Sequence, residues 1–122
     1  GESCADWEFA ACAERDPYMW YGGNADRHTH PVGTKLPNPF GIHDMHGNVW
    51  EWCEDEYRED FYSTPDAMRP DPLCAPGSGD RVDRGGSWGS GARLCRCAFR
   101  SRDLPRFRWG HLRGFRPSAP CP

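Results

Sequence analysis

Two acidic residues in the segment 41–55 lie on either side of a glycine-containing turn, seven positions apart. They are Asp44 and Glu51, and the turn between them contains Gly47. Calcium binds six to eight oxygen atoms and accepts carboxylates together with backbone carbonyls. Such a turn can aim the carbonyls of Gly47 and Val49 at an ion that the two carboxylates neutralise. The segment therefore predicts a calcium site; alternatively, Glu51 pairs with an arginine and Asp44 caps a turn.

Thiol chemistry is a second possibility, because the chain has seven cysteines, an odd number that leaves at least one unpaired within the chain. Cys95 and Cys97 are one residue apart, so on a strand they point to opposite faces. No Cys-x-x-Cys pair is present, so a structural zinc site is not expected. The sequence allows one or two disulfides, and equally allows free thiols buried in the core.

Four of the five histidines form two close pairs that suggest transition-metal ligands. His28 is two residues from His30, and His43 is three residues from His46. Histidines this close together in a turn are more often surface residues, so no transition-metal site is predicted.

Short elements must position these residues, because glycine and proline make up 26 of the 122 residues. Apolar side chains at helical spacing predict a helix at about 4–14. Alternating side chains predict short strands, and the turn-rich stretches between them predict loops. The strands are expected within 41–55, at 81–84, at 92–100 and from 114, and the loops at 15–40, 56–80 and 101–113.

The net charge of −3 hides two parts of opposite sign. Residues 1–86 hold seven basic and 17 acidic side chains, whereas residues 87–122 hold eight arginines and one acid, Asp103. The two parts either pair internally or leave a basic recognition face for an anionic ligand, a protein with an acidic surface or a nucleic acid. Arginine without lysine indicates planar, bidentate contacts, and a protein partner is favoured over nucleic acid. No run of 18 apolar residues is present, so no membrane span is expected.

Four segments carry motifs too specific to arise from composition: GIHDMHGNVWEWCED at 41–55, RVDRGGSW at 81–88, GFR at 114–116 and a Trp-Glu-aromatic-Ala-Ala run at 7–11. Together they resemble the signature blocks of the formylglycine-generating enzyme (sulfatase-modifying factor) family. The resemblance implies an α+β, C-type-lectin-like fold with short antiparallel strands, one or two short helices and much irregular structure. It implies that residues 1–122 form one domain without the family's usual N-terminal portion. It also implies a structural calcium ion at Asp44, Gly47, Val49 and Glu51.

Catalytic members of this family hold copper with two cysteines shortly after a Gly-Gly-Ser-aromatic motif, and soft thiolates suit Cu(I). Here that motif ends at Trp88, and no cysteine follows until Cys95. Cys97 better matches a non-catalytic cysteine that precedes an Ala-aromatic-Arg run. The copper pair is therefore expected to be absent, and formylglycine-generating activity with it.

Non-catalytic branches of the family include the variable proteins of diversity-generating retroelements, in which randomised codons fall in the corresponding region. Those codons cannot encode Lys, Glu, Gln, Met or Trp. Residues 1–86 contain 11 residues of the first four types, whereas residues 87–116 contain none. Ten residues in this region fit such codons, and Trp109 would have to be a fixed position. The predicted ligand-binding residues are Gly89, Ser90, Gly91, Leu94, Phe99, Ser101, Leu104, Phe107, Trp109, His111 and Leu112.

The sequence therefore favours a non-catalytic binding domain whose recognition face is residues 89–112, where apolar side chains among arginines form a composition typical of binding hot spots. In the competing interpretation, these apolar side chains pack the core. Two further functions stay open: a sulfatase-modifying enzyme or a fragment of one, and a structural subunit that completes another chain. A near-identical, adenine-rich template repeat near the encoding DNA would indicate a retroelement.

Overall fold

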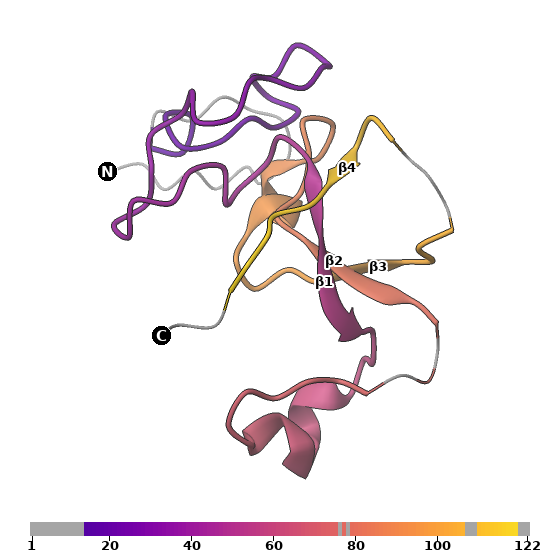
Figure 1. Ribbon diagram of the computed structural model, residues 1–122. Helices are drawn as coiled ribbons and strands as arrows, with labels where there is room; N and C mark the ends of the chain where they lie inside the picture. Colours follow the sequence, from indigo (N-terminus) through magenta and orange to yellow (C-terminus); the bar gives the residue numbers. More distant parts are fainter. Residues whose placement is uncertain (1–13, 76, 78, 107–109, 120–122) are drawn as a thin grey trace.

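A four-stranded mixed sheet forms the centre of the computed structural model, which describes residues 14–75, 77, 79–106 and 110–119 (Figure 1). The strands lie in the order β3-β2-β1-β4. β2 is antiparallel to both β1 and β3, whereas β4 is parallel to β1. The bounds are Trp50–Glu56 for β1, Arg81–Arg84 for β2, Ser101–Asp103 for β3 and Arg113–Gly114 for β4.

Three short 3-10 helices lie in the connections between strands. Both η1 (Phe61–Ser63) and η2 (Pro65–Met68) belong to the connection from β1 to β2, beyond the end of β1 (Figure 1). η3 (Ala92–Cys95) belongs to the connection from β2 to β3. Within the described ranges, no helix is long and apolar enough to cross a bilayer.

The strands predicted within 41–55 and at 81–84 are confirmed as β1 and β2, and the last strand begins at Arg113, one residue before the predicted start. The predicted strand at 92–100 is wrong, because its first part is the helix η3. Ala92 and Cys95 are both buried at a spacing of three, the repeat of a 3-10 helix. β3 lies inside the predicted loop 101–113, and the helix predicted at 4–14 falls, apart from its last residue, outside the described chain.

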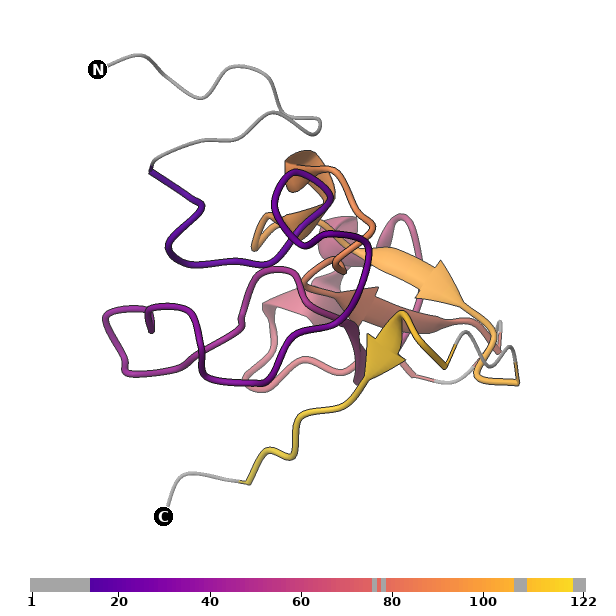
Figure 2. The ribbon, with the colours of Figure 1, turned by 90° about the horizontal axis from the view of Figure 1, so that it is seen from above.

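The core is small and lies where the loop of residues 19–21 meets η3. Met19, Tyr21, Ala92 and Cys95 form one buried cluster. The hydroxyl of the fully buried Tyr21 donates a hydrogen bond to Asp16 Oδ1 at 2.9 Å, which satisfies its polar end. The loops of residues 14–47 gather around the start of β1, as both views show (Figure 1, Figure 2).

Asn48 joins the segments of Trp20, His30 and Trp88 by hydrogen bonds, and we call this set of bonds the Asn48 clasp. Its backbone N–H donates to the carbonyl of Trp20 at 2.7 Å, and its carbonyl accepts from the N–H of Trp88 at 2.8 Å. Its side chain accepts from the N–H of His30 at 2.9 Å and donates to the carbonyl of His30 at 3.1 Å. The preceding Gly47 forms a parallel bridge with Trp20.

Candidate functional site

A cavity of about 630 Å³ brings together five of the predicted ligand-binding residues, and we call it the recognition pocket. Aromatic side chains from Trp50 and Trp88 and arginines from Arg27 and Arg93 also line this cavity. The five predicted residues in its lining are Gly89, Ser90, Gly91, Leu94 and Leu112.

Buried serines fix the loop that forms one wall of the recognition pocket. Ser90 Oγ accepts a hydrogen bond from the N–H of Ser87 at 3.0 Å, and Ser87 Oγ accepts one from the N–H of Gly89 at 3.3 Å. The carbonyl of Ser90 accepts from the N–H of Gly22 at 2.9 Å. Ser90 and Gly91 are buried, whereas Gly89 is exposed. Ser90 therefore shapes the pocket from within.

Trp88 is held rigidly at the edge of the recognition pocket. Its indole Nε1–H donates to the carbonyl of His111 at 2.7 Å, and its backbone N–H belongs to the Asn48 clasp. The exposed ring of His111 lies 6.1 Å from the Trp88 ring, centroid to centroid. His111 thus borders the pocket, while Leu94 and Leu112 are half-buried in its lining.

The arginines of the basic segment divide into paired and unpaired groups. Three of them form ion pairs with acids of residues 1–86, so internal pairing accounts for part of the charge asymmetry. Arg93 of this segment and Arg27 of the first part are exposed at the recognition pocket, and their guanidinium groups form no ion pair with any residue that the structure describes. The internal pairs are Arg102–Asp80, Arg113–Asp83 and Arg116–Glu51.

The remaining predicted ligand-binding residues lie away from the pocket or outside the described ranges. Phe99 packs against Trp50, with ring centroids 6.1 Å apart. Ser101 begins β3 and Leu104 follows it, at the opposite edge of the sheet from β4. The order β3-β2-β1-β4 therefore separates these residues from Leu112. Phe107 and Trp109 lie outside the described residues.

The predicted calcium ligands are close together, but Glu51 already has a partner. Asp44, Val49 and Glu51 line a cavity of about 560 Å³, and Gly47 is not in its lining. Asp44 is buried, its Oδ2 accepts the N–H of Gly33 at 2.7 Å, and its Oδ1 has no hydrogen-bond partner among the residues that the structure describes. Both Glu51 oxygens are bound by Arg116, at 2.8 and 3.0 Å.

These residues fit calcium in part. The unpartnered Asp44 Oδ1 is a free acceptor, as a cation site requires, whereas Glu51 is available only if Arg116 releases it. In the structure Glu51 pairs with Arg116, which is the alternative to a calcium site that the sequence left open. Across the described ranges, no three His, Cys, Asp or Glu residues are grouped to hold a metal.

The histidines and thiols have individual structural settings. Each of the four close-set histidines has a ring nitrogen within hydrogen-bond distance of a backbone carbonyl, and His30 also stacks on Trp20 at 3.7 Å. Cys95 is buried and Cys97 exposed, but Cys95 is the last residue of η3, so the two do not lie on a strand as predicted. Cys53, Cys74, Cys95 and Cys97 are free thiols.

Sequence reasoning did not name six lining residues of the recognition pocket, among them Trp50, Trp88 and Arg27. Trp50 and Trp88 belong to motifs that were interpreted as scaffold, and Arg27 lies in a loop without any periodic pattern. The Asn48 clasp and the bond from the Gly22 N–H to the Ser90 carbonyl join the distant loops that bring Arg27 and Trp88 to one pocket.

Fold and motifs together define the class of protein. Residues 3–118 match the sulfatase-modifying factor enzyme 1-like domain, so the chain belongs to the formylglycine-generating enzyme family. This confirms the resemblance and the α+β, C-type-lectin-like fold of that family.

Individual relatives include both an enzyme and a variable protein. The structure is similar to Treponema denticola variable protein 1, with a TM-score of 0.74 and 36% identity over 86% of this chain and 37% of that one. The sequence is 34% identical to the formylglycine-generating enzyme of Streptomyces coelicolor over 90% of this chain and 35% of the enzyme. It is 39% identical to serine/threonine-protein kinase pkn1 of Chlamydia caviae over 83% of this chain and 18% of the kinase.

The chain thus spans at most 37% of the length of each of these three proteins. The 122 residues contain neither the His-Arg-Asp nor the Asp-Phe-Gly motif that protein kinases use for catalysis. The similarity to the kinase therefore concerns a shared domain and gives no reason to assign kinase chemistry to this chain.

Proposed function

We propose that this domain binds a protein ligand at the recognition pocket and catalyses no reaction there. The observation that carries the proposal is the pocket itself, which gathers five predicted ligand-binding residues beside Trp88 and two arginines that form no ion pair with the described residues. Tryptophan and arginine are the residues most enriched in binding hot spots. The similarity to a variable protein supports a binding role of this kind.

The charge at the pocket favours a ligand with an acidic surface. A guanidinium binds a carboxylate through two parallel hydrogen bonds, and Arg27 and Arg93 are both available for such contacts. Leu94 and Leu112 supply apolar surface between them. A ligand that offers a carboxylate next to an apolar or aromatic side chain matches this combination.

Selection from a displayed library of random peptides tests this function. Peptides enriched on the wild-type domain are expected to bind the double variant Arg27→Gln, Arg93→Gln about 30-fold more weakly, which corresponds to the loss of about 2 kcal/mol from one hot spot. Their dissociation constants are measured by titration calorimetry at two salt concentrations, since binding by exposed charges weakens with salt.

Arg69→Gln is the matched control, because Arg69 is also exposed but pairs with Asp66 at the distant helix η2. It is expected to leave peptide binding unchanged. Equal affinity of the double variant and the wild type would contradict a role for the pocket arginines, and failure to enrich any peptide would contradict the binding function.

The runner-up function is a sulfatase-modifying enzyme or a fragment of one, which the similarity to formylglycine-generating enzymes supports. The segment between Ser87 and Leu94 has no thiol. Burial raises the pKa of Cys95 to about 12, so this residue stays a protonated thiol at neutral pH. A cysteine-containing sulfatase-type peptide is therefore expected to gain no formylglycine, with or without copper; product detected by mass spectrometry would support the enzyme.

We also propose that the domain binds calcium at Asp44 and Glu51, whose carboxylates line one cavity. Asp44 Oδ1 has no hydrogen-bond partner among the described residues. Calcium bound there would replace Arg116 as the partner of Glu51. An excess of calcium over chelator is then expected to raise the melting temperature, because an ion that binds only the folded form stabilises it by mass action, by about 2.7 kcal/mol at 100 times its Kd.

Magnesium is the matched cation control, because it requires a smaller octahedral site and is expected to have little effect. Asp44→Asn is expected to abolish the calcium response. If calcium leaves the wild-type melting temperature unchanged, Glu51 keeps Arg116 and the calcium site is not formed.

A further inference from the structure

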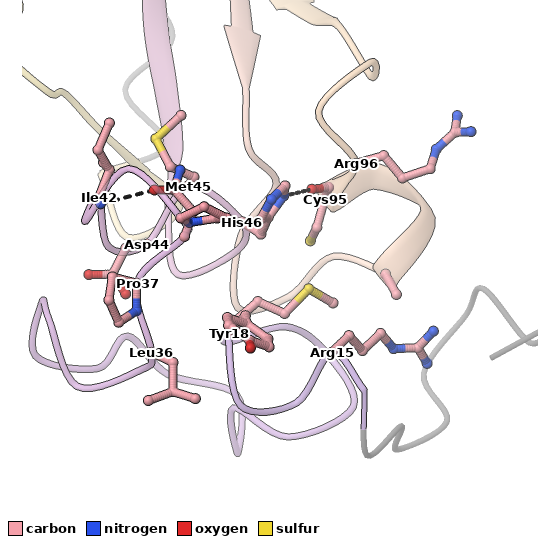
Figure 3. Close-up of a pocket in the computed structure, with 14 residues that line it drawn as sticks. Arg15, Tyr18, Leu36, Pro37, Ile42, Asp44, Met45, His46, Cys95 and Arg96 are labelled. Carbon is pink, nitrogen blue, oxygen red and sulfur yellow. Dashed lines mark hydrogen bonds between the residues drawn. The ribbon is translucent and has the colours of Figure 1, made fainter. Parts of the chain in front are cut away.

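Cys97 and His46 form a thiol–imidazole pair outside the recognition pocket, although 51 positions separate them in the sequence. Cys97 Sγ lies 3.7 Å from His46 Nε2, and Cys97 is exposed. The other ring nitrogen, His46 Nδ1, lies 2.6 Å from the carbonyl oxygen of Cys95 (Figure 3). A carbonyl can only accept a hydrogen bond, so Nδ1 carries the hydrogen and Nε2 faces Cys97 as an acceptor.

Two arginines lie close to Cys97. The guanidinium of Arg84 donates to the carbonyl of Cys97 at 2.8 Å, and Arg96 precedes Cys97 in the chain and is exposed. Reactive cysteines occupy partly exposed positions next to arginine, lysine or histidine, and Cys97 has an exposed position of this kind.

The other described thiols differ from Cys97 in access or in charge. Cys74 and Cys95 are buried. Cys53 is half-buried, and burial raises its pKa; Arg84 acts in the opposite direction, and the acids Asp55, Asp83 and Glu51 add to the increase. Cys53 is therefore a natural internal reference: a thiol of the same molecule with acids as neighbours.

A cavity of about 620 Å³ lies next to the pair and offers room for a substituent on the sulfur. His46, Cys95 and Arg96 belong to its lining, together with apolar side chains such as Ile42 and Met45 (Figure 3). Cys97 itself is not in the lining, but its partner His46 and its neighbour Arg96 are.

We propose that Cys97 is a modification site for negatively charged, low-molecular-weight disulfides of the glutathione class. In the reaction, the Cys97 sulfur attacks one sulfur of the disulfide, a new S–S bond forms and the original one breaks. Cys97 is oxidised to the mixed disulfide, and the other half of the reagent is reduced and leaves as a thiol, which carries the proton that Cys97 gives up. Excess thiol reverses the reaction.

The test compares two disulfides of opposite charge on the reduced, full-length chain. Oxidised glutathione is anionic and cystamine is cationic, and mass spectrometry of the peptides gives a rate for each of the seven cysteines separately. Among the four described thiols, Cys97 is expected to react fastest with oxidised glutathione. The ratio of the glutathione rate to the cystamine rate is expected to be about tenfold higher at Cys97 than at Cys53, at the lower end of electrostatic steering effects.

Each ratio compares two reagents at the same cysteine, so the exposure of that cysteine cancels. The difference between the ratios at Cys97 and Cys53 therefore measures the preference for the anionic reagent. Arg96→Gln is expected to lower the ratio at Cys97, whereas the matched control Arg69→Gln, in an exposed pair at η2, is expected to leave it unchanged. The proposal is overturned if Cys97 is not the fastest of the four, or if its ratio equals that of Cys53. An unchanged ratio in Arg96→Gln also counts against selection by arginine.

Discussion

Replacing Gly47 by alanine is expected to lower the free energy of unfolding by about 3 kcal/mol or more. Gly47 has a φ of +75°, where a side chain is strained, and an added Cβ would overlap the carbonyl of Trp20. That carbonyl also accepts the hydrogen bond from Asn48, so any shift that relieves the overlap disturbs the Asn48 clasp. Urea unfolding of the variant measures the loss.

Gly41→Ala is a matched control, since Gly41 has nearly the same φ, +76°, but an added Cβ there meets nothing within 4 Å. It is expected to cost only the conformational penalty of about 1–2 kcal/mol. The difference between the two variants isolates the overlap with Trp20. Equal losses would mean that the loop of Trp20 moves aside without cost and that the clasp is not rigid.

Replacing Arg113 by methionine is the second change with a large expected effect. Asp83 is fully buried, and Arg113 Nη2 lies 2.9 Å from its carboxylate and 2.8 Å from that of Asp103. Methionine fills a similar volume but leaves the buried carboxylate of Asp83 without its counter-ion. A loss of about 3–5 kcal/mol in the free energy of unfolding is expected.

Arg102→Met is the control for Arg113→Met, because Arg102 lies 3.8 Å from Asp80 and its side chain is 61% exposed. Exposed pairs contribute little, so a loss below about 1 kcal/mol is expected. Comparable losses in the two variants would show that burial does not increase the contribution of the Arg113 ion pair to the free energy of unfolding.

The loss in Arg113→Met should also depend on pH. Burial raises the pKa of Asp83 above its ordinary 3.8, while hydrogen bonding and the charge of Arg113 oppose this. Removing Arg113 therefore raises this pKa further. An acid with a raised folded-state pKa favours the folded form below its unfolded pKa and loses that contribution as the pH rises through the folded pKa. The difference between variant and wild type is expected to shrink as the pH falls from neutral toward 4.

Local patterns in the sequence identify the strands but not the pocket. Alternation around Trp52 and the motif ending at Trp88 predict β1 and β2 correctly, since each follows the period of a strand. The same reasoning fails at Ala92, because the buried residues there, Ala92 and Cys95, are three positions apart and follow the repeat of a 3-10 helix. The sequence does not predict Arg27 as a pocket residue, because its position depends on contacts between loops that are far apart in the sequence. Such contacts leave no periodic pattern in the local sequence.

The pairing of the charged residues could not be predicted from the sequence either. The sequence shows an arginine-rich segment but not which arginines are free, because pairing depends on the order of strands. Arg113 and Arg116 lie at and just after β4, which pairs with β1 and brings them to Asp83 and Glu51. Arg93 belongs to η3, not to β4, and forms no ion pair with any residue that the structure describes.

The groups that hold the recognition pocket in shape are not the side chains that would contact a ligand. The Asn48 clasp and the two buried serines do the first. Main-chain bonds and the hydroxyls of Ser87 and Ser90 hold the loop, while the side chains at 93 and 94 take no part in those bonds. Gly89 has room for a side chain, since a Cβ there comes no closer than 3.7 Å to its neighbours. Such a surface is mutationally robust: many sequences can be tried at these positions on one constant backbone, so new specificities can evolve without a new fold.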